Sequence, residues 1–343
     1  MTVSEFRSRF GDEVLCGEHL TAQRWPNGFV CPRCGGRSRG YMASRRVHEC
    51  TGCGYQSSVT AGTIFHKTRT PLSSWFWAIY RMSQDKKGIS ALQLSKEIGV
   101  SYPTAWLMQH KIRKAMADRD QGYRLQGLIE VDEGYVGGAE QGEAQKGRGA
   151  KTKSVVAVAV ECRAPGQEGE KPIPGFAALA VVPNAAASSL HGFLQAKIQP
   201  GSQVMSDGWR GYQGLERQGF QHTAMPLHGD PEAARRLFPW VHITLSNLKR
   251  FLLGTHHKVE PQHLQRYVAE FNYRLNRRTM EANLFQRLVR ACLTTNTIIY
   301  KELIPAGSSL IFIKAFYACA LSHNRAVTGV TASMVVKFVH WFW

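Results

Sequence analysis

The first 25 residues of the chain have hydrophobic residues at helical spacing. Phe6, Phe10, Val14 and Leu20 recur along residues 1–25, and this pattern predicts amphipathic helical structure there. A Trp-Pro-Asn-Gly sequence at 25–28 then interrupts the pattern. This interruption indicates that a separate module follows the first helical segment.

Residues 70–118 predict a helical segment with a helix-turn-helix pattern. A strongly apolar helix is expected over 70–83, followed by an amphipathic helix at 89–97, an Ile-Gly-Val turn, and a second helix from Ser101 to about 116. The second helix carries polar and basic residues suited to a DNA groove and its phosphates. These candidate DNA-binding residues are Gln109, His110, Lys111, Arg113 and Lys114. The alternative is an ordinary helical hairpin whose charges face solvent.

From residue 128 the pattern changes to apolar strand-like runs that alternate with helical stretches. Strands are expected at 128–133, 153–162, 176–183 and 203–206, and helices at 185–198, 209–217, 244–254 and 261–278. A Gly- and Lys-rich loop spans 134–152. Strands with helices between and after them predict a mixed sheet flanked by helices, and therefore an α/β fold class.

The net charge of the chain indicates the kind of molecule that it binds. The 343 residues include 43 Lys and Arg against 25 Asp and Glu, a formal net charge of +18. Such an excess predicts a polyanionic partner, with nucleic acid favoured over an acidic protein. No uncharged apolar run approaches the roughly 20 residues of a membrane-spanning helix, so no membrane partner is expected.

Four cysteines give the strongest local signal. They form a C-x2-C-x15-C-x2-C pattern whose two knuckles supply the tetrahedral ligand set of a structural Zn²⁺, and they are Cys31, Cys34, Cys50 and Cys53. The alternative is a pair of disulfides in a secreted domain. We expect no signal peptide, because residues 1–15 lack an apolar core. The remaining cysteines are scattered, which favours thiols in a reducing cytoplasm.

Two aspartates at predicted strand ends are candidate catalytic residues. Asp132 ends the first strand and Asp207 follows the strand at 203–206. Acidic side chains at neighbouring strand ends can hold two Mg²⁺ ions about 3.5–4 Å apart. A third ligand is expected from the stretch 240–250, which contains no carboxylate but offers Asn247. An isolated strand-end Asp, or a surface asparagine, is also common without any catalytic role.

Together these stretches resemble the insertion-sequence transposases of ISXO type. The resemblance spans roughly residues 15–303 and rests on CPRCGG…CTGCGYQ, GTIFHKTRTPLSSWFWAIYRM, GLIEVDEGYVGG, SDGWRGY, SNLKRFLLGTHHKV and RYVAEFNYRLNRR. In part of this family Asn replaces the third acid and a Lys follows. The resemblance implies an RNase H-like catalytic domain of DDE-related type. Asp132, Asp207 and Asn247 would bind Mg²⁺ or Mn²⁺, and Lys249 would lie near the scissile phosphate.

The resemblance also implies a domain order and a reaction. The expected parts are an N-terminal helical segment (1–25), a zinc ribbon (26–66), a helical DNA-binding segment (70–118), a catalytic domain (125–303) and an apolar tail (304–343). The resemblance ends near residue 303, and we expect the tail to have no selected function; the alternative is an extra packing element at the end of the domain. The reaction would be metal-dependent cleavage at element ends and strand transfer into target DNA, by a homo-oligomer in the cytoplasm. The alternatives are a catalytically inactive DNA-binding protein and an RNase H-like nuclease without strand transfer.

Overall fold

The computed structural model describes residues 1–137, 153–163, 173–227 and 229–304. Most of the predicted loop at 134–152 and all but the first residue of the predicted tail lie outside these ranges. Contacts divide the chain into two units, 1–297 and 298–343, and the described part of the second contains a short 3₁₀ helix, Tyr300–Glu302.

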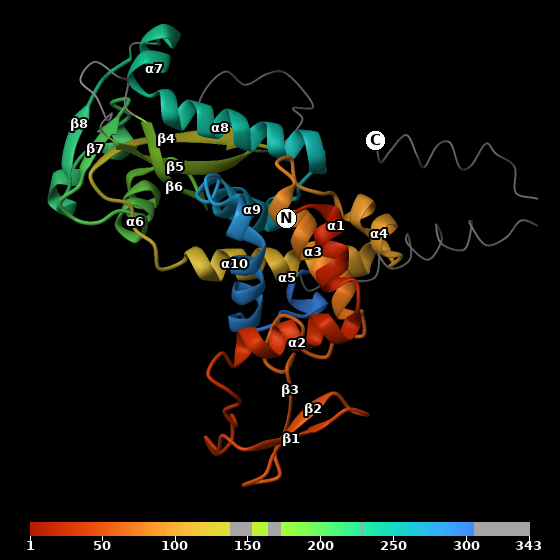
Figure 1. Cartoon of the computed structure of the whole chain (residues 1–343). Coiled ribbons are helices and arrows are strands. Elements are labelled where there is room, and N and C mark those ends of the chain that lie inside the picture. Colours follow the sequence, from red (N-terminus) through yellow and green to blue (C-terminus); the bar gives the residue numbers. More distant parts are fainter. Residues whose placement is uncertain (138–152, 164–172, 228, 305–343) are drawn as a thin grey trace, which may run out of the picture. The chain divides into compact units, whose positions relative to one another are not determined.

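A small antiparallel sheet forms the ribbon. It consists of β1 (Arg39–Met42), β2 (Val47–Cys50) and β3 (Gln56–Ser58), in that order. Two helices precede it, α1 (Val3–Phe10) and α2 (Glu13–Arg24), which Figure 1 shows in red beside the orange ribbon. Asp12 separates them because its side chain accepts the backbone N–H of Val14 and caps the second helix. The single helical segment expected over 1–25 is thus two helices.

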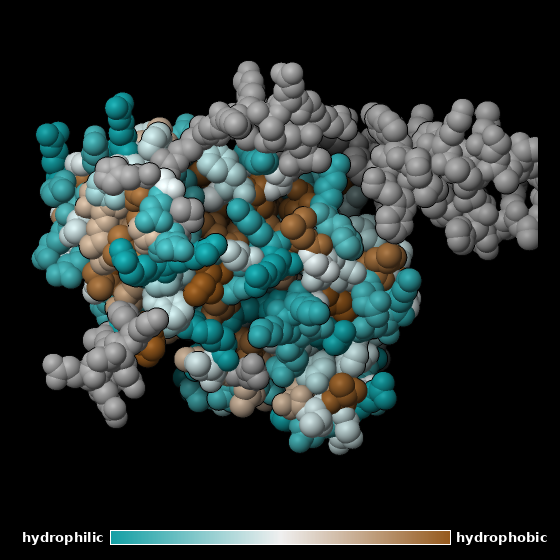
Figure 2. All heavy atoms as spheres, turned by 90° about the horizontal axis from the view of Figure 1, so that it is seen from above, coloured by the Kyte–Doolittle hydropathy of each residue, from teal (hydrophilic) through white to brown (hydrophobic). Residues whose placement is uncertain are grey.

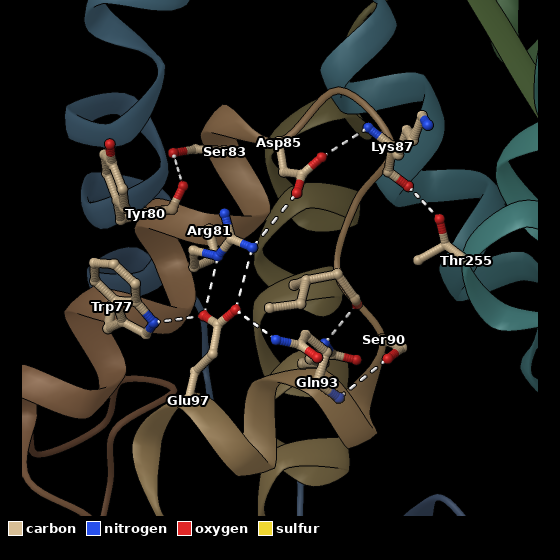
Figure 3. A network of polar contacts seen from close by, with 12 residues as sticks. Trp77, Tyr80, Arg81, Ser83, Asp85, Lys87, Ser90, Gln93, Glu97 and Thr255 are labelled. Atoms are coloured by element: carbon tan, nitrogen blue, oxygen red, sulfur yellow. Dashed lines mark hydrogen bonds and ion pairs between the residues drawn. The ribbon is translucent and has the colours of Figure 1, made fainter. Parts of the chain in front are cut away.

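The helical segment contains α3 (Leu72–Gln84), α4 (Ala91–Ile98) and α5 (Tyr102–Asp120). The side chains of Ser90 and Ser101 cap the N-termini of α4 and α5. Gly99 ends α4 in the left-handed region at φ 67°. Glu97 of α4 accepts hydrogen bonds from Trp77 and Arg81 of α3 (Figure 3). The three helices predicted from hydrophobic spacing are therefore present.

The larger sheet is mixed, with the strand order β6-β5-β4-β7-β8. Within it, β4, β5 and β6 pair antiparallel in that order, whereas β7 runs parallel to β4 and β8 runs parallel to β7. The strands are β4 (Leu128–Val136), β5 (Ser154–Arg163), β6 (Ile173–Val182), β7 (Gln203–Ser206) and β8 (Gln221–Ala224). The four predicted strands are confirmed, and β8 was missed because three of its four residues are polar and most are exposed.

Helices cover both faces of this sheet. One face packs against α6 (Ala187–Lys197) and the short 3₁₀ helices Arg210–Tyr212 and Leu215–Gln218. The other face packs against α8 (Pro239–Phe251) and α9 (Pro261–Leu275), which enclose a second core. A short α7 (Pro231–Leu237) leads into α8, and η3 (Leu252–His256), a π-helical turn, extends it. Figure 1 shows α8 lying along the strands.

The last long helix, α10 (Glu281–Thr294), joins a different core from the one that the sequence suggested. Its buried residues Leu284, Phe285 and Leu288 pack with α1, α2, α3 and α5 rather than with the sheet. The chain passes from the helical core to the cores of the sheet between residues 116 and 125, and it returns to the helical core from Tyr273 onward. The domain bounds 70–118 and 125–303 stay a prediction. Among the described residues, no helix is long and apolar enough to cross a membrane.

Candidate active site and zinc ribbon

Asp132 and Asp207 occupy matched positions on neighbouring parallel strands. Strand β4 pairs with β7 in a register that places Glu130 beside Met205, and two residues further along both strands lie Asp132 and Asp207. Adjacent strands lie about 4.8 Å apart, so this register brings the two residues close together within the sheet. Asp132 is the middle residue of β4 and not, as the sequence predicted, its last, because β4 continues to Val136, whereas Asp207 directly follows β7. Their strand positions also direct both toward the face that α8 covers.

Helix α8 contributes His242 to the same place. Its Nδ1 lies 3.6 Å from Oδ2 of Asp132. The Asp132 side chain is 14% exposed and the His242 side chain 37%, so the pair lies at the rim of the core, within reach of a ligand. Burial lowers the pKa of His242, although the charges of Glu130 and Asp207 act in the opposite direction. A neutral imidazole has a lone pair available for a metal ion.

Asn247 lies on a different side of α8. Five residues separate it from His242, which corresponds to about 140° around a helix of 3.6 residues per turn. It is exposed, whereas its neighbours Leu245 and Leu248 are buried against the sheet. Asn247 therefore lies on a different side of α8 from His242, the residue that contacts Asp132. The metal-binding role of Asn247 stays a prediction.

Lys249 lies on the same side of α8 as His242. Seven residues correspond to two turns less about 20°, so the two side chains follow one line along the helix. Lys249 and its neighbour Arg250 are both exposed. Both side chains are therefore accessible to a phosphate, and the predicted contact of Lys249 with the scissile phosphate stays a prediction.

The ribbon places its four cysteines in one cluster. Their sulfur atoms all lie within 4.8 Å of one another. The Sγ atoms of Cys31 and Cys53 are 3.7 Å apart, and those of Cys34 and Cys50 are 3.6 Å apart. A tetrahedral ion with Zn–S bonds of about 2.3 Å requires sulfur separations of about 3.8 Å. The cluster therefore fits a structural Zn²⁺.

Both knuckles have the same backbone geometry. The N–H of Cys31 donates to the carbonyl of Gly36, and the N–H of Cys50 donates to that of Tyr55. Each knuckle also contains a glycine at positive φ, Gly35 at 74° and Gly54 at 66°. A Cβ added at Gly36 would lie 3.2 Å from the sulfur of Cys50. The two Cys-x-x-Cys turns have the same conformation, and short segments of sequence are therefore enough to form the zinc site.

Comparison with known families identifies both parts of the chain. Residues 124–276 match the family model of the ISXO2-like transposase domain, and residues 11–56 match that of the transposase zinc-ribbon domain. The chain carries an ISXO2-like transposase domain. The resemblance to insertion-sequence transposases is thereby confirmed, together with the zinc ribbon. No curated protein matched the chain.

The predicted DNA-binding side chains of α5, which precedes the ISXO2-like domain, are mostly buried. Gln109, His110 and Arg113 are at most 1% exposed, and Lys111 is 8% exposed. Arg113 pairs with Glu270 of α9 at 2.7 Å, where both side chains are fully buried. Arg113 therefore joins α5 to α9, and the four buried side chains do not face a DNA groove. Of the five, only Lys114 is appreciably exposed, and it pairs with Asp118.

A Ser-His-Glu chain lies beside Asp207 in the ISXO2-like domain. Ser206 Oγ lies 2.9 Å from His222 Nε2, and His222 Nδ1 lies 3.6 Å from Glu216. The residue types match those of a hydrolytic triad. However, Ser206 is 0% exposed and therefore has no access to a substrate. The chain instead connects the end of β7 to β8 and holds the strand that presents Asp207.

On the opposite face of the sheet, a buried tyrosine adjoins the same carboxylates. Tyr212 donates from its hydroxyl to Glu133 at 3.0 Å. Burial, together with the negative charges of Glu133, Asp132 and Asp207, raises the pKa of Tyr212. The influence of both aspartates on one hydroxyl is consistent with their shared location. Glu133, which follows Asp132 in the sequence, is thus directed away from α8 and into a structural contact.

Proposed function

We propose that this protein is a DNA transposase that cleaves at the ends of its element and transfers the strand to target DNA. One observation carries the proposal. Within a transposase-family domain, the strand register places Asp132 and Asp207 side by side, and His242 of the covering helix contacts the first of them. The chain also has a net charge of +18, which suits a phosphodiester backbone.

The proposed site would hold Mg²⁺ or Mn²⁺ through Asp132, Asp207 and His242. Such ions supply Lewis-acid activation of an attacking oxygen and stabilisation of a leaving oxygen. The three side chains would hold and orient the ions. Lys249 and Arg250 place positive charge where a phosphate would approach. Water attacks the phosphodiester at the element end and breaks its P–O3′ bond, which leaves a 3′-hydroxyl and a 5′-phosphate. This hydroxyl then attacks a target phosphodiester and displaces the 3′ oxygen of the target strand. One phosphodiester replaces another, so no external energy source is required.

The RNase H-like fold belongs to this proposal. Its support is a five-stranded mixed sheet with helices on both faces, in which the carboxylates come from adjacent parallel strands. Histidine in the third position lowers the negative charge of the site relative to a DDE triad. We therefore expect weaker metal affinity, and a preference for Mn²⁺ over Mg²⁺ because imidazole is a softer ligand than carboxylate.

DNA ends would also contact the ribbon. A groove of ≈ 1060 Å³ lies between the ribbon and α2, distant in sequence from the carboxylates. Its wall includes the exposed side chains of Arg39, Tyr41 and Arg45. Arginines engage phosphates, and an exposed tyrosine can stack on bases. On the face seen in Figure 2, hydrophilic residues predominate and hydrophobic ones form small scattered groups. Pairing of two element ends further requires a dimer or larger assembly.

A cleavage and strand-transfer assay tests this function. The full zinc-loaded chain is incubated with DNA carrying the repeats that flank its gene, in Mn²⁺ or Mg²⁺. We expect nicked and joined products that disappear in Asp132→Ala, Asp207→Ala and His242→Ala but persist in Asn247→Ala, the matched change on the other side of α8. Binding without cleavage would instead identify an inactive DNA-binding protein. Cleavage without joined products would identify a nuclease.

A further inference from the structure

One face of β4 meets α8 at three successive positions. Side chains alternate along a strand, so Glu130, Asp132 and Gly134 project from the same face. The middle residue contacts His242 at 3.6 Å. The two flanking residues also contact α8, on either side of that pair, and they determine where the helix lies.

Glu130 binds the first turn of α8. Its Oε2 accepts the backbone N–H of Trp240 at 2.8 Å and that of Val241 at 3.1 Å. Its Oε1 accepts the thiol of Cys162 on β5 at 3.2 Å. The residue is 3% exposed. Both carboxylate oxygens therefore have protein donors, and Glu130 is directed at the helix end and not at the rim where Asp132 lies.

Helix α8 has no cap from its own sequence. Phe238 precedes it without a side-chain cap hydrogen bond, and Pro239 occupies the first helical position and has no N–H. The next two backbone amides would lack partners at a buried helix end. Glu130 accepts both, and its negative charge also suits the positive end of the helix dipole. His242 follows these two residues directly.

Gly134 makes the second contact. A Cβ placed at this glycine would lie 2.7 Å from Cδ2 of Leu245, closer than real side chains approach. The helix can therefore lie against β4 at this point because glycine leaves room for Leu245. Glu130 and Gly134 hold α8 at two points, with the Asp132–His242 pair between them.

We propose that Glu130 is a positioning residue of the metal site: it fixes the first turn of α8 so that His242 reaches the ion held by Asp132 and Asp207. This inference rests on the proposed function, because it concerns the same site. Glu130 itself does not bind the ion. Its role is to connect the strand that carries one ligand to the helix that carries another.

The test compares Glu130→Ala and Glu130→Gln with a matched control, Glu161→Ala. A glutamine oxygen can still accept both α8 amides while its NH₂ faces the Cys162 sulfur, so Gln restores the contacts without the charge. Glu161 is also a buried strand glutamate that accepts two backbone amides, those of Gln126 and Phe176. Its register partner Ile129 belongs to the core on the opposite face of the sheet.

Two quantities are measured on the full zinc-loaded chain. The first is the Mn²⁺ dissociation constant, from electron paramagnetic resonance titration at a temperature where every variant is folded. The second is hydrogen–deuterium exchange of the peptide 239–248. We expect Glu130→Ala to weaken Mn²⁺ binding by about 10–100-fold, the usual effect of removing a group that orients a ligand, and to accelerate exchange. Glu130→Gln restores both, and Glu161→Ala alters neither.

Three results would overturn the positioning role alone: unchanged Mn²⁺ affinity in Glu130→Ala, unchanged exchange in that variant, or a Gln variant as weak as Ala, which would make the carboxylate charge a ligand in its own right. The same loss of affinity in Glu161→Ala would reduce the effect to general destabilisation. A native chain that binds no Mn²⁺ overturns the proposed metal site itself, and is distinguished because it appears before any variant is made.

Discussion

The ribbon and the α/β domain build their sites in opposite ways. The zinc ligands lie within 23 consecutive residues, and two identical backbone turns bring them together. The carboxylate site joins Asp132, Asp207 and His242, which span more than 100 residues and come from two strands and a helix. The first site depends on local turns and the second on strand register and helix phase. The zinc site should therefore tolerate changes in the packing of helices and strands that would separate the residues of the carboxylate site.

Removal of a zinc ligand should have the largest effect and should be confined to the ribbon. For Cys50→Ala we expect loss of bound zinc and of ribbon order, because structural Zn²⁺ supplies roughly 10 kcal/mol of binding free energy to such modules. Metal content by mass spectrometry and the thermal transition of the remaining chain check this. Cys162→Ala, outside the ribbon, is the control and should retain one zinc. Global unfolding of Cys50→Ala would contradict the independence of the two regions.

The converse prediction concerns the buried pair Arg113–Glu270. Arg113→Met should lower the free energy of unfolding by about 3 kcal/mol, because a buried carboxylate loses its nearest partner and keeps only Arg274 at 3.4 Å. Denaturant titration measures this loss, while zinc content should remain unchanged. Arg81→Met is the matched control, since the partly exposed pair Arg81–Glu97 is worth about 1 kcal/mol or less. An equal effect of the two changes would refute the argument.

Acid should destabilise the protein through buried histidines in the helical segment and beside α8. Burial, with Arg113, lowers the pKa of His256 from 6.5 to about 3, and burial lowers the pKa of His110 as well. The unfolded chain therefore binds more protons below pH 6.5, so stability falls as the pH decreases from about 6.5 toward 3, by up to about 1.4 kcal/mol per pH unit for each histidine. Thermal melts of native chain and His256→Phe across this range provide the measurement, and the variant should show a shallower slope. Parallel curves for the two proteins would count against it.

The smallest expected effect decides which α8 residue completes the site. His242→Glu adds one negative charge beside Asp132 and should tighten Mg²⁺ binding by about 10-fold, whereas Asn247→Glu should change it less than about 2-fold, because a charge on the far side of the helix is screened by water. Calorimetric titration of the two variants provides the comparison. A larger gain from Asn247→Glu would restore the third position suggested by the sequence and would remove His242 from the proposed site.

Local signals explain what could be predicted. The cysteine spacing, the apolar runs of strands such as β5 and the helix start at Ser101 each depend on neighbours in the sequence, and all are confirmed. The basic face of α5 was misassigned because a buried Arg and an exposed Arg are identical in sequence. Only Glu270, 157 positions away, reveals which one Arg113 is.

His242 was accessible to sequence reasoning only in part. It lies within the stretch 240–250 from which a third ligand was expected, but nothing local distinguishes a ligand from a core histidine. Glu130 had one available signal, its spacing of two residues before Asp132 on a strand, which places both on one face. That signal does not disclose the uncapped helix end that Glu130 binds, because Trp240 and Val241 lie 110 residues downstream.

The sequence by itself determined the ribbon, the helical and strand segments, the charge and the two aspartates, because hydrophobic period, turn chemistry and metal-ligand spacing act over a few residues. Tertiary structure alone decided that α10 completes the helical core, that α5 directs its charges inward, and that His242 rather than Asn247 faces Asp132. The physical reason is that register and helix phase are set by packing between distant segments. A residue at the wrong phase of a helix has the same sequence neighbours as one at the right phase.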